Sequence, residues 1–136
     1  MPNFIFSEHV TRTCKACFIQ LCNLRRIRQY ITREVAILAA NALVSSRLDY
    51  CNSPLRGISS FNEKKLQSIQ NTLAHIVSNK RKLDHVTPIL KGLHWLPVSY
   101  NCLFKTATLV YKYLHSGLPS YLGPYLSQSS CTYKTR

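Results

Sequence analysis

The chain has 136 residues, of which 46% are hydrophobic and 17% are charged. This length suits one domain with a real hydrophobic core, and the composition excludes a disordered tail. The 18 Lys and Arg residues outnumber the 5 Asp and Glu residues, which leaves a net charge of +13, and 13 of the 18 lie within residues 1–83. We therefore expect a polyanionic partner on this first part of the chain, with nucleic acid favoured over an anionic membrane surface.

The sequence shows neither a membrane-spanning pattern nor a signal-peptide pattern. Its longest apolar-leaning stretch, residues 35–44, is ten residues long, whereas a spanning helix needs about 20. The N-terminus has no basic segment ahead of its few apolar residues. We expect an intracellular protein, nuclear or cytoplasmic and not secreted, with no membrane partner. The six cysteines are then interpreted as thiols, mostly small core residues.

Five helical segments and no strand are predicted, which indicates an all-α fold of five or six helices. Ser7 is expected to cap the first helix, and Arg25, Arg26 and Arg28 follow at its C-terminal end, where the helix dipole favours cations. Apolar residues recur every three or four positions and predict its buried face. They are Val10, Cys14, Cys17, Phe18, Leu21 and Leu24.

The second helix is predicted to start at an N-cap, Thr32, with Glu34 in its first turn, and to end before Pro54. Its expected inward-facing residues are Val35, Leu38, Ala39, Ala42 and Leu43. The third helix is expected to begin at Ser60, because Ser60 and Glu63 have capping-box spacing, and to reach Asn79. Its predicted stripe is Leu66, Ile69, Leu73, Ile76 and Val77.

The stretch HVTPILKGLHWLPV, residues 85–98, has the pattern of a short helix, a turn and a second helix start. Thr87 precedes Pro88 as an N-cap precedes a first helical position, and Gly92 is expected to stop this helix. Trp95 is expected to close the junction and to be mostly buried. Pro97 repeats the start signal.

The last helix is predicted to run from Pro97 until Gly117 ends it. One apolar stripe is expected along it. Its members are Tyr100, Leu103, Phe104, Ala107, Val110, Tyr111 and Leu114.

Two cysteines, Cys14 and Cys17, have the spacing of a zinc-ligand pair. A structural zinc site needs four ligands, usually from two such pairs, and no second pair occurs. We therefore favour a buried helix stripe over a metal site at these positions.

Two histidines, His85 and His94, could act with Cys51 as base and nucleophile, but no feature of the sequence brings the three together. Structural roles, in hydrogen bonds or caps, are the favoured interpretation. The acids occur singly, so no two-metal site is predicted. They are Glu8, Glu34, Asp49, Glu63 and Asp84. We expect no catalytic residues, metal, cofactor or small-molecule substrate.

Two basic clusters flank helix junctions, and an aromatic residue within the first is able to stack on a base or ribose. These clusters favour contact with phosphates. The candidate nucleic-acid-binding residues are Arg25, Arg26, Arg28, Tyr30, Arg33, Lys80, Arg81 and Lys82.

The motifs SRLDYCNS, IQNTLA and HVTPILKGLHWLPV occur in this order. Over residues 6–126 the chain resembles the C-terminal part of reverse transcriptases from jockey-type non-LTR (LINE-like) retrotransposons. The resemblance implies a helical thumb and the helical region that follows it, without the palm that carries the catalytic aspartates, because the Y/F-x-D-D motif has no match. Pro54, Arg56 and Asn101 depart from the family, which usually has a leucine, an aromatic residue and an arginine there.

This resemblance implies a thumb-like segment over residues 1–57, a post-thumb region packed with it over 58–126, and a polar tail over 127–136. We expect a truncated, non-catalytic protein derived from a retrotransposon reverse transcriptase. It would hold template and primer, RNA or DNA, through basic helix ends and with little sequence preference. An inert helical remnant with no physiological partner is the alternative, and an enzyme with a Cys and His site is a third. The oligomeric state is left open.

Overall fold

The computed structural model describes the backbone of residues 2–52 and 59–117, and the side chains of residues 7–50 and 59–117. These residues are mostly helical and contain no strand, which confirms the predicted all-α class. The elements are α1 (Pro2–Ile27), η1 (Arg28–Tyr30), α2 (Arg33–Ala40), η2 (Asn41–Ser45), α3 (Ser46–Asn52), α4 (Ser60–Ser78), α5 (Val86–Gly92) and α6 (Val98–Ser116). None of the described helices is long and apolar enough to cross a membrane.

Packing divides the chain into two compact units, Met1–Leu103 and Phe104–Arg136. The first holds α1 to α5 and the start of α6, so residues from both predicted domains share one unit. The predicted boundary at residue 57, the departures at Pro54 and Arg56, and the polar tail lie outside the described residues.

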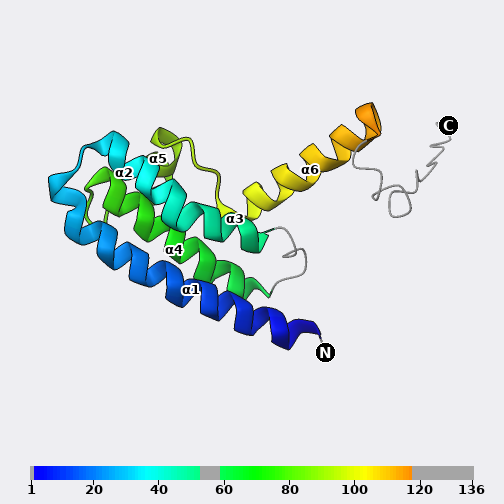
Figure 1. The fold of residues 1–136 in the computed structure, drawn as a ribbon, viewed down its shortest axis with the longest axis horizontal. Coiled ribbons are helices and arrows are strands. Elements are labelled where there is room, and N and C mark those ends of the chain that lie inside the picture. The colour runs from blue at the N-terminus through cyan, green and yellow to red at the C-terminus, as the bar shows by residue number, and fades with distance from the viewer. Residues whose placement is uncertain (1, 53–58, 118–136) are drawn as a thin grey trace. The chain divides into compact units, whose positions relative to one another are not determined.

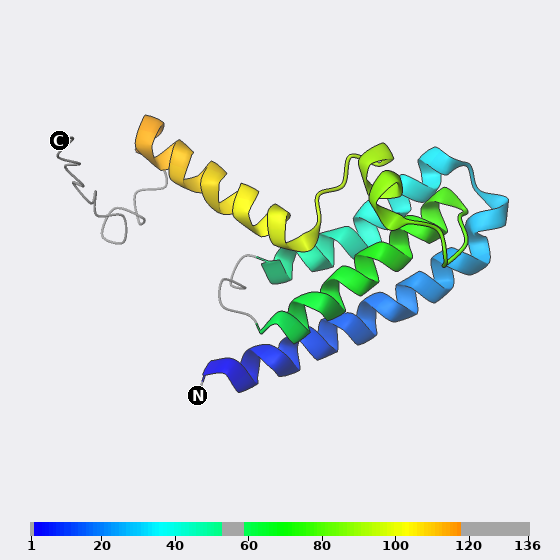
Figure 2. The same ribbon diagram turned by 180° about the vertical axis from the view of Figure 1, so that it is seen from behind.

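The first unit is a bundle in which α1 and α4 run side by side in the same direction (Figures 1 and 2). Between them the chain returns through α2, η2 and α3; α2 packs on both helices, and η2 and α3 pack on α1. The 3₁₀ turn η1 makes the reversal after α1. Because α1 and α4 point the same way, their C-terminal ends meet at one end of the bundle.

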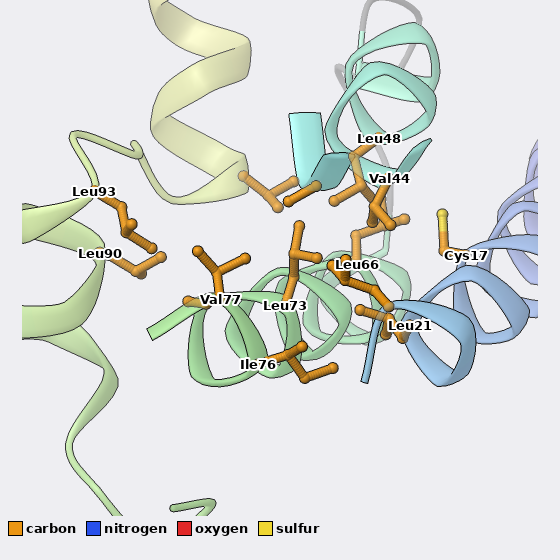
Figure 3. Close-up of a cluster of buried hydrophobic side chains, with 14 of the residues drawn as sticks. Cys17, Leu21, Val44, Leu48, Leu66, Leu73, Ile76, Val77, Leu90 and Leu93 are labelled. Carbon is orange, nitrogen blue, oxygen red and sulfur yellow. The ribbon is translucent and has the colours of Figure 1, made fainter. Parts of the chain in front are cut away.

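Buried side chains from α1 to α5, from η2 and from the start of α6 fill one core, part of which Figure 3 shows. The predicted stripe on α4 is confirmed, because Leu66, Leu73, Ile76 and Val77 are buried and Ile69 packs against them. The stripe on α1 is confirmed except at one position. The side chain of Phe18 is 60% exposed, whereas the prediction placed it in the core.

The prediction for the second helix chose mostly the wrong face. Val35, Leu38, Ala42 and Leu43 are exposed, and only Ala39 of the predicted set is half-buried against the core. The buried stripe is instead Ala36, Ala40, Val44 and Leu48. Alanine has little side chain to hold the helices apart, so this face of α2 can lie close to α1 and α4, whereas the bulkier residues remain outside.

The buried stripe of this second helix recurs every four residues, and the helix changes form to keep it inward. A four-residue repeat drifts around a regular helix, which has about 3.6 residues per turn. The π-helical segment Asn41–Ser45 widens the helix and offsets this drift. Ser46 donates its hydroxyl to the carbonyl of Ala42 at 2.7 Å within the same region.

Of the four predicted N-terminal caps, one is confirmed and three are wrong. Thr87 lies inside α5, whose N-cap is His85. The Thr32 hydroxyl accepts a hydrogen bond from the Val35 amide at 3.4 Å, as expected for an N-cap. Ser7 lies inside α1, which begins at Pro2. The N-cap of α4 is Ser59 rather than Ser60. The Ser59 side chain forms no cap hydrogen bond, and its backbone carbonyl accepts from the amides of Asn62 and Glu63.

The end of α4 is closed by a Schellman motif. Asn79 is left-handed, with φ of 52°, and donates its amide to the carbonyl of Ile76 at 3.2 Å. Lys80 donates its amide to the carbonyl of His75 at 3.0 Å. This pair of bonds satisfies two terminal carbonyls of the helix and turns the chain back on itself.

The stretch HVTPILKGLHWLPV ends its short helix with the same motif. His94 is left-handed, with φ of 56°, and its amide bonds to Lys91 at 3.1 Å, while the Trp95 amide bonds to Leu90 at 3.0 Å. The stop is therefore at His94, two residues after the glycine predicted to supply it, and Gly92 is helical. Trp95 is half-buried against the core, where the sequence predicted it mostly buried.

Two side chains tie the start of α6 to the rest of the first unit. The side-chain amide of Asn101 donates to a carboxylate oxygen of Asp49 at 2.8 Å, and the backbone amide of Val98 donates to the side-chain oxygen of Gln67 at 2.9 Å. Val98 is buried. The apolar stripe predicted to continue along this helix is largely exposed among the described residues, including Tyr100 and Leu103.

Candidate nucleic-acid interface

A hollow of about 310 Å³ lies where the C-terminal ends of α1 and α4 meet. We call it the basic hollow. It is lined by Phe18, Arg25, Arg28, Thr72, His75, Ile76, Asn79, Lys80 and Lys82. The structure therefore brings together members of both basic clusters predicted from the sequence, although the clusters are about fifty residues apart along the chain.

Helix periodicity explains which residues face this hollow. Phe18 and Arg25 are seven positions apart on α1, which places them almost directly above one another. On α4, Thr72 and Ile76 are four positions apart and share one face, and Asn79 follows at the left-handed residue that ends the helix. The Schellman turn then carries Lys80 and Lys82 back over the helix end.

One basic residue of the hollow, Arg28, has a structural partner. Its Nε and Nη2 atoms donate to the carbonyl oxygen of Val77 at 3.0 and 2.8 Å, and its Nη1 donates to the carbonyl of Ile31 at 3.1 Å. Val77 lies in the last turn of α4, where carbonyls lack helical partners. The structure therefore assigns Arg28 to closing the end of α4.

The charge around the hollow is strongly positive. Of the described residues that line it, four are Lys or Arg and none is acidic. An ion pair between Arg12 and Glu8, at 3.4 Å, lies on the surface of α1 away from the hollow. The two helix C-termini contribute about half a negative charge each. Four cations exceed this, so the hollow attracts anions.

A second hollow of about 400 Å³ adjoins the first and shares Lys80 with it. It is lined by Arg33, Ser78, Lys80, Asp84, His85, Pro88, Ile89 and Gly92. The Asp84 carboxylate accepts a hydrogen bond from the Arg81 amide at 2.9 Å, so it orders the turn after α4. Arg33 and Lys80 are the basic side chains that line this second hollow.

The other three predicted contact residues, Arg26, Tyr30 and Arg81, are exposed and line neither hollow. Tyr30, at the end of η1, is 79% exposed. These three residues are close in sequence to residues that line the hollows, but the structure does not place them in either one.

The sequence did not identify Phe18, Thr72, His75 and Asn79 as site residues. Phe18 was placed in the core because it fits the apolar repeat of α1. Thr72 belongs to the IQNTLA motif, but no local pattern marks the residues of α4 as binding residues. They reach the site only because α4 packs beside α1 with the same direction. A helix pairing of this kind leaves no signal in one sequence.

The candidate metal and nucleophile positions are spread over the core and the ends of α5 where they are described. Cys17 is buried in the core, as the stripe interpretation expected, and Cys14 is half-buried beside it. His85 is the N-cap position of α5, and His94 is its left-handed terminating residue. The side chain of Cys51 lies outside the described residues. Among those that are described, no group of three His, Cys, Asp or Glu residues is placed to hold a metal.

No protein-family model, curated protein or solved structure matches the chain. The site is therefore interpreted from its own geometry and charge.

Proposed function

We propose that the chain is a non-catalytic, sequence-independent nucleic-acid-binding domain derived from the thumb and post-thumb region of a LINE-type reverse transcriptase. The observation that supports the binding proposal best is the basic hollow, in which cations from two distant segments gather without an acidic residue among its described lining residues. The family origin rests on the motifs of the sequence alone.

A nucleic-acid backbone is the partner that fits this charge distribution. Arg25, Lys80 and Lys82 border one hollow, and Arg33 with Lys80 borders the next, so cations follow a path rather than a point. A chain of phosphates can contact such a path at several places, and each neutralised phosphate releases counterions. Because phosphates carry no sequence information, we expect little discrimination among sequences.

The test is a salt titration of binding to a single-stranded RNA, a single-stranded DNA and a primed duplex. The site variant carries Arg25→Gln, Lys80→Gln and Lys82→Gln. Each lost phosphate contact should reduce the slope of log affinity against log salt by about 0.7 on single strands, so the three together should reduce it by about 2. Comparison of the three ligands shows the preference for RNA or DNA.

The matched control removes the same charge from elsewhere on the surface, through Arg47→Gln, Lys64→Gln and Lys91→Gln. These residues are exposed and line neither hollow. The proposal expects the control to keep a steeper slope than the site variant. Equal slopes, or no measurable binding by the unaltered protein at low salt, would favour the inert helical remnant instead.

A further inference from the structure

The basic hollow is lined by apolar and polar side chains in addition to the cations that would bind a phosphate. Phe18 and Ile76 give it apolar surface, Thr72 and Asn79 give it polar side chains, and the cations lie around them. At about 310 Å³ its volume reaches the range of pockets that hold small organic molecules, which is about 300–1,000 Å³. A bare inorganic anion would use the cations and leave the aromatic side chain without a role.

Phe18 is the feature that calls for a ligand with a flat face. Its side chain is 60% exposed although it belongs to the apolar repeat of α1. A large apolar side chain that lines a cationic hollow can stack against a nucleobase, and such stacking tolerates every base because each has a π face.

We propose that the basic hollow takes up one unstacked nucleotide of a single-stranded RNA or DNA, with its base against Phe18 and its flanking phosphates at Arg25, Lys80 and Lys82. This inference rests on the proposed function and names the substructure of the nucleic acid that the site prefers. The nucleotide comes from a single strand, because extruding a base from a duplex requires unpairing and unstacking that contact with one ring does not repay.

The polar side chains suit any of the bases. The Thr72 hydroxyl donates to the carbonyl of Ser68 at 2.9 Å, so its oxygen remains an acceptor. The amide of Asn79 offers both donors and an acceptor. In His75, Nδ1 is buried without a hydrogen-bond partner.

The experiment compares an oligonucleotide with an abasic strand of equal length, which keeps the phosphates and removes the bases. At equal salt, the unaltered protein should bind the base-containing strand about tenfold more tightly, the effect expected of one stacked base. Phe18→Ala should remove this preference without changing the salt slope. Phe18→Tyr should retain it, because the ring is kept.

Ile19→Ala is the matched control, because Ile19 adjoins Phe18 and is 59% exposed but does not line the hollow. It should keep the tenfold preference. Helical circular dichroism and melting of each variant show that it is folded, and the comparison of the two strands on the unaltered protein needs no variant.

Equal affinity of the unaltered protein for both strands, or the same loss in Phe18→Ala and Ile19→Ala, would overturn the nucleotide assignment while leaving phosphate binding intact. Failure to bind either strand at low salt would instead overturn the proposed function and this inference with it.

Discussion

The guanidinium of Arg28 donates two hydrogen bonds to the carbonyl oxygen of Val77, from Nε at 3.0 Å and from Nη2 at 2.8 Å. The two residues are separated by 49 positions and belong to different helical segments. A third donor reaches Ile31, so one side chain joins the turn after α1 to the last turn of α4. The positive charge also lies at the negative pole of α4, where it is stabilising.

Removing this side chain should destabilise the fold. We expect Arg28→Ala to lower the free energy of unfolding by about 1.5–3 kcal/mol, since hydrogen bonds to a charged group are lost and the Val77 carbonyl loses its partner. Arg28→Lys should recover only part of the loss, because an ammonium group cannot reproduce the planar fork. Urea denaturation measures both. Arg26→Ala, an exposed neighbour, should change stability by less than about 0.5 kcal/mol.

Two substitutions near the end of α5 should each stabilise the protein. Gly92 is helical, and a Cβ atom added to it would meet no atom within 4 Å. Gly92→Ala should therefore stabilise the protein by about 0.5–1 kcal/mol. His94→Gly should also stabilise it, because His94 is left-handed and glycine adopts this conformation without strain. Thermal melting tests both, and destabilisation by His94→Gly would show that its side chain has a role.

The alanine face of α2 should tolerate no added bulk. Ala40 is fully buried, so Ala40→Leu should force the helices apart and cost about 1–3 kcal/mol. Ala42→Leu is the matched substitution two residues later, at an exposed position, and should be nearly neutral. Chemical denaturation of both variants tests the choice of face, and equal effects would contradict it.

The proposal of a domain without a palm predicts no polymerase activity. The purified chain should incorporate no deoxynucleotides on a primed template with Mg²⁺ or Mn²⁺, because its acids occur singly along the sequence and do not form the paired carboxylates that metal-assisted transfer requires. Incorporation above a no-protein reaction would refute this expectation. The primed duplex used in the salt titration serves as the substrate.

The helix positions could be predicted from the sequence better than the helix faces. The α4 stripe follows from its strong three-and-four repeat, and the Thr32 cap from local chemistry. The face of α2 could not be predicted in this way, because its buried residues include two alanines, which hydrophobicity ranks below the valine and leucines beside them. Small size, which decides close helix packing, has little weight in a hydrophobic pattern.

The candidate site could likewise be predicted only in part from the sequence. Local composition identified the basic clusters around Arg25 and Lys80, but their meeting depends on α1 and α4 packing in the same direction. The sequence also grouped Arg28 with its neighbours, since nothing local distinguishes an arginine that binds a backbone carbonyl. Phe18 was misplaced because a periodic apolar residue is usually buried.

The hydrogen bond that ends α4 joins two residues of the basic hollow, since the Lys80 amide donates to the His75 carbonyl. Fraying of that last turn would therefore take the hollow apart, and only molecules with the turn closed would be competent to bind. A ligand that requires the closed turn must in return hold it closed. Amide hydrogen exchange at Asn79 and Lys80 should accordingly slow when a single-stranded oligonucleotide is added, while exchange at the exposed start of α4 stays the same.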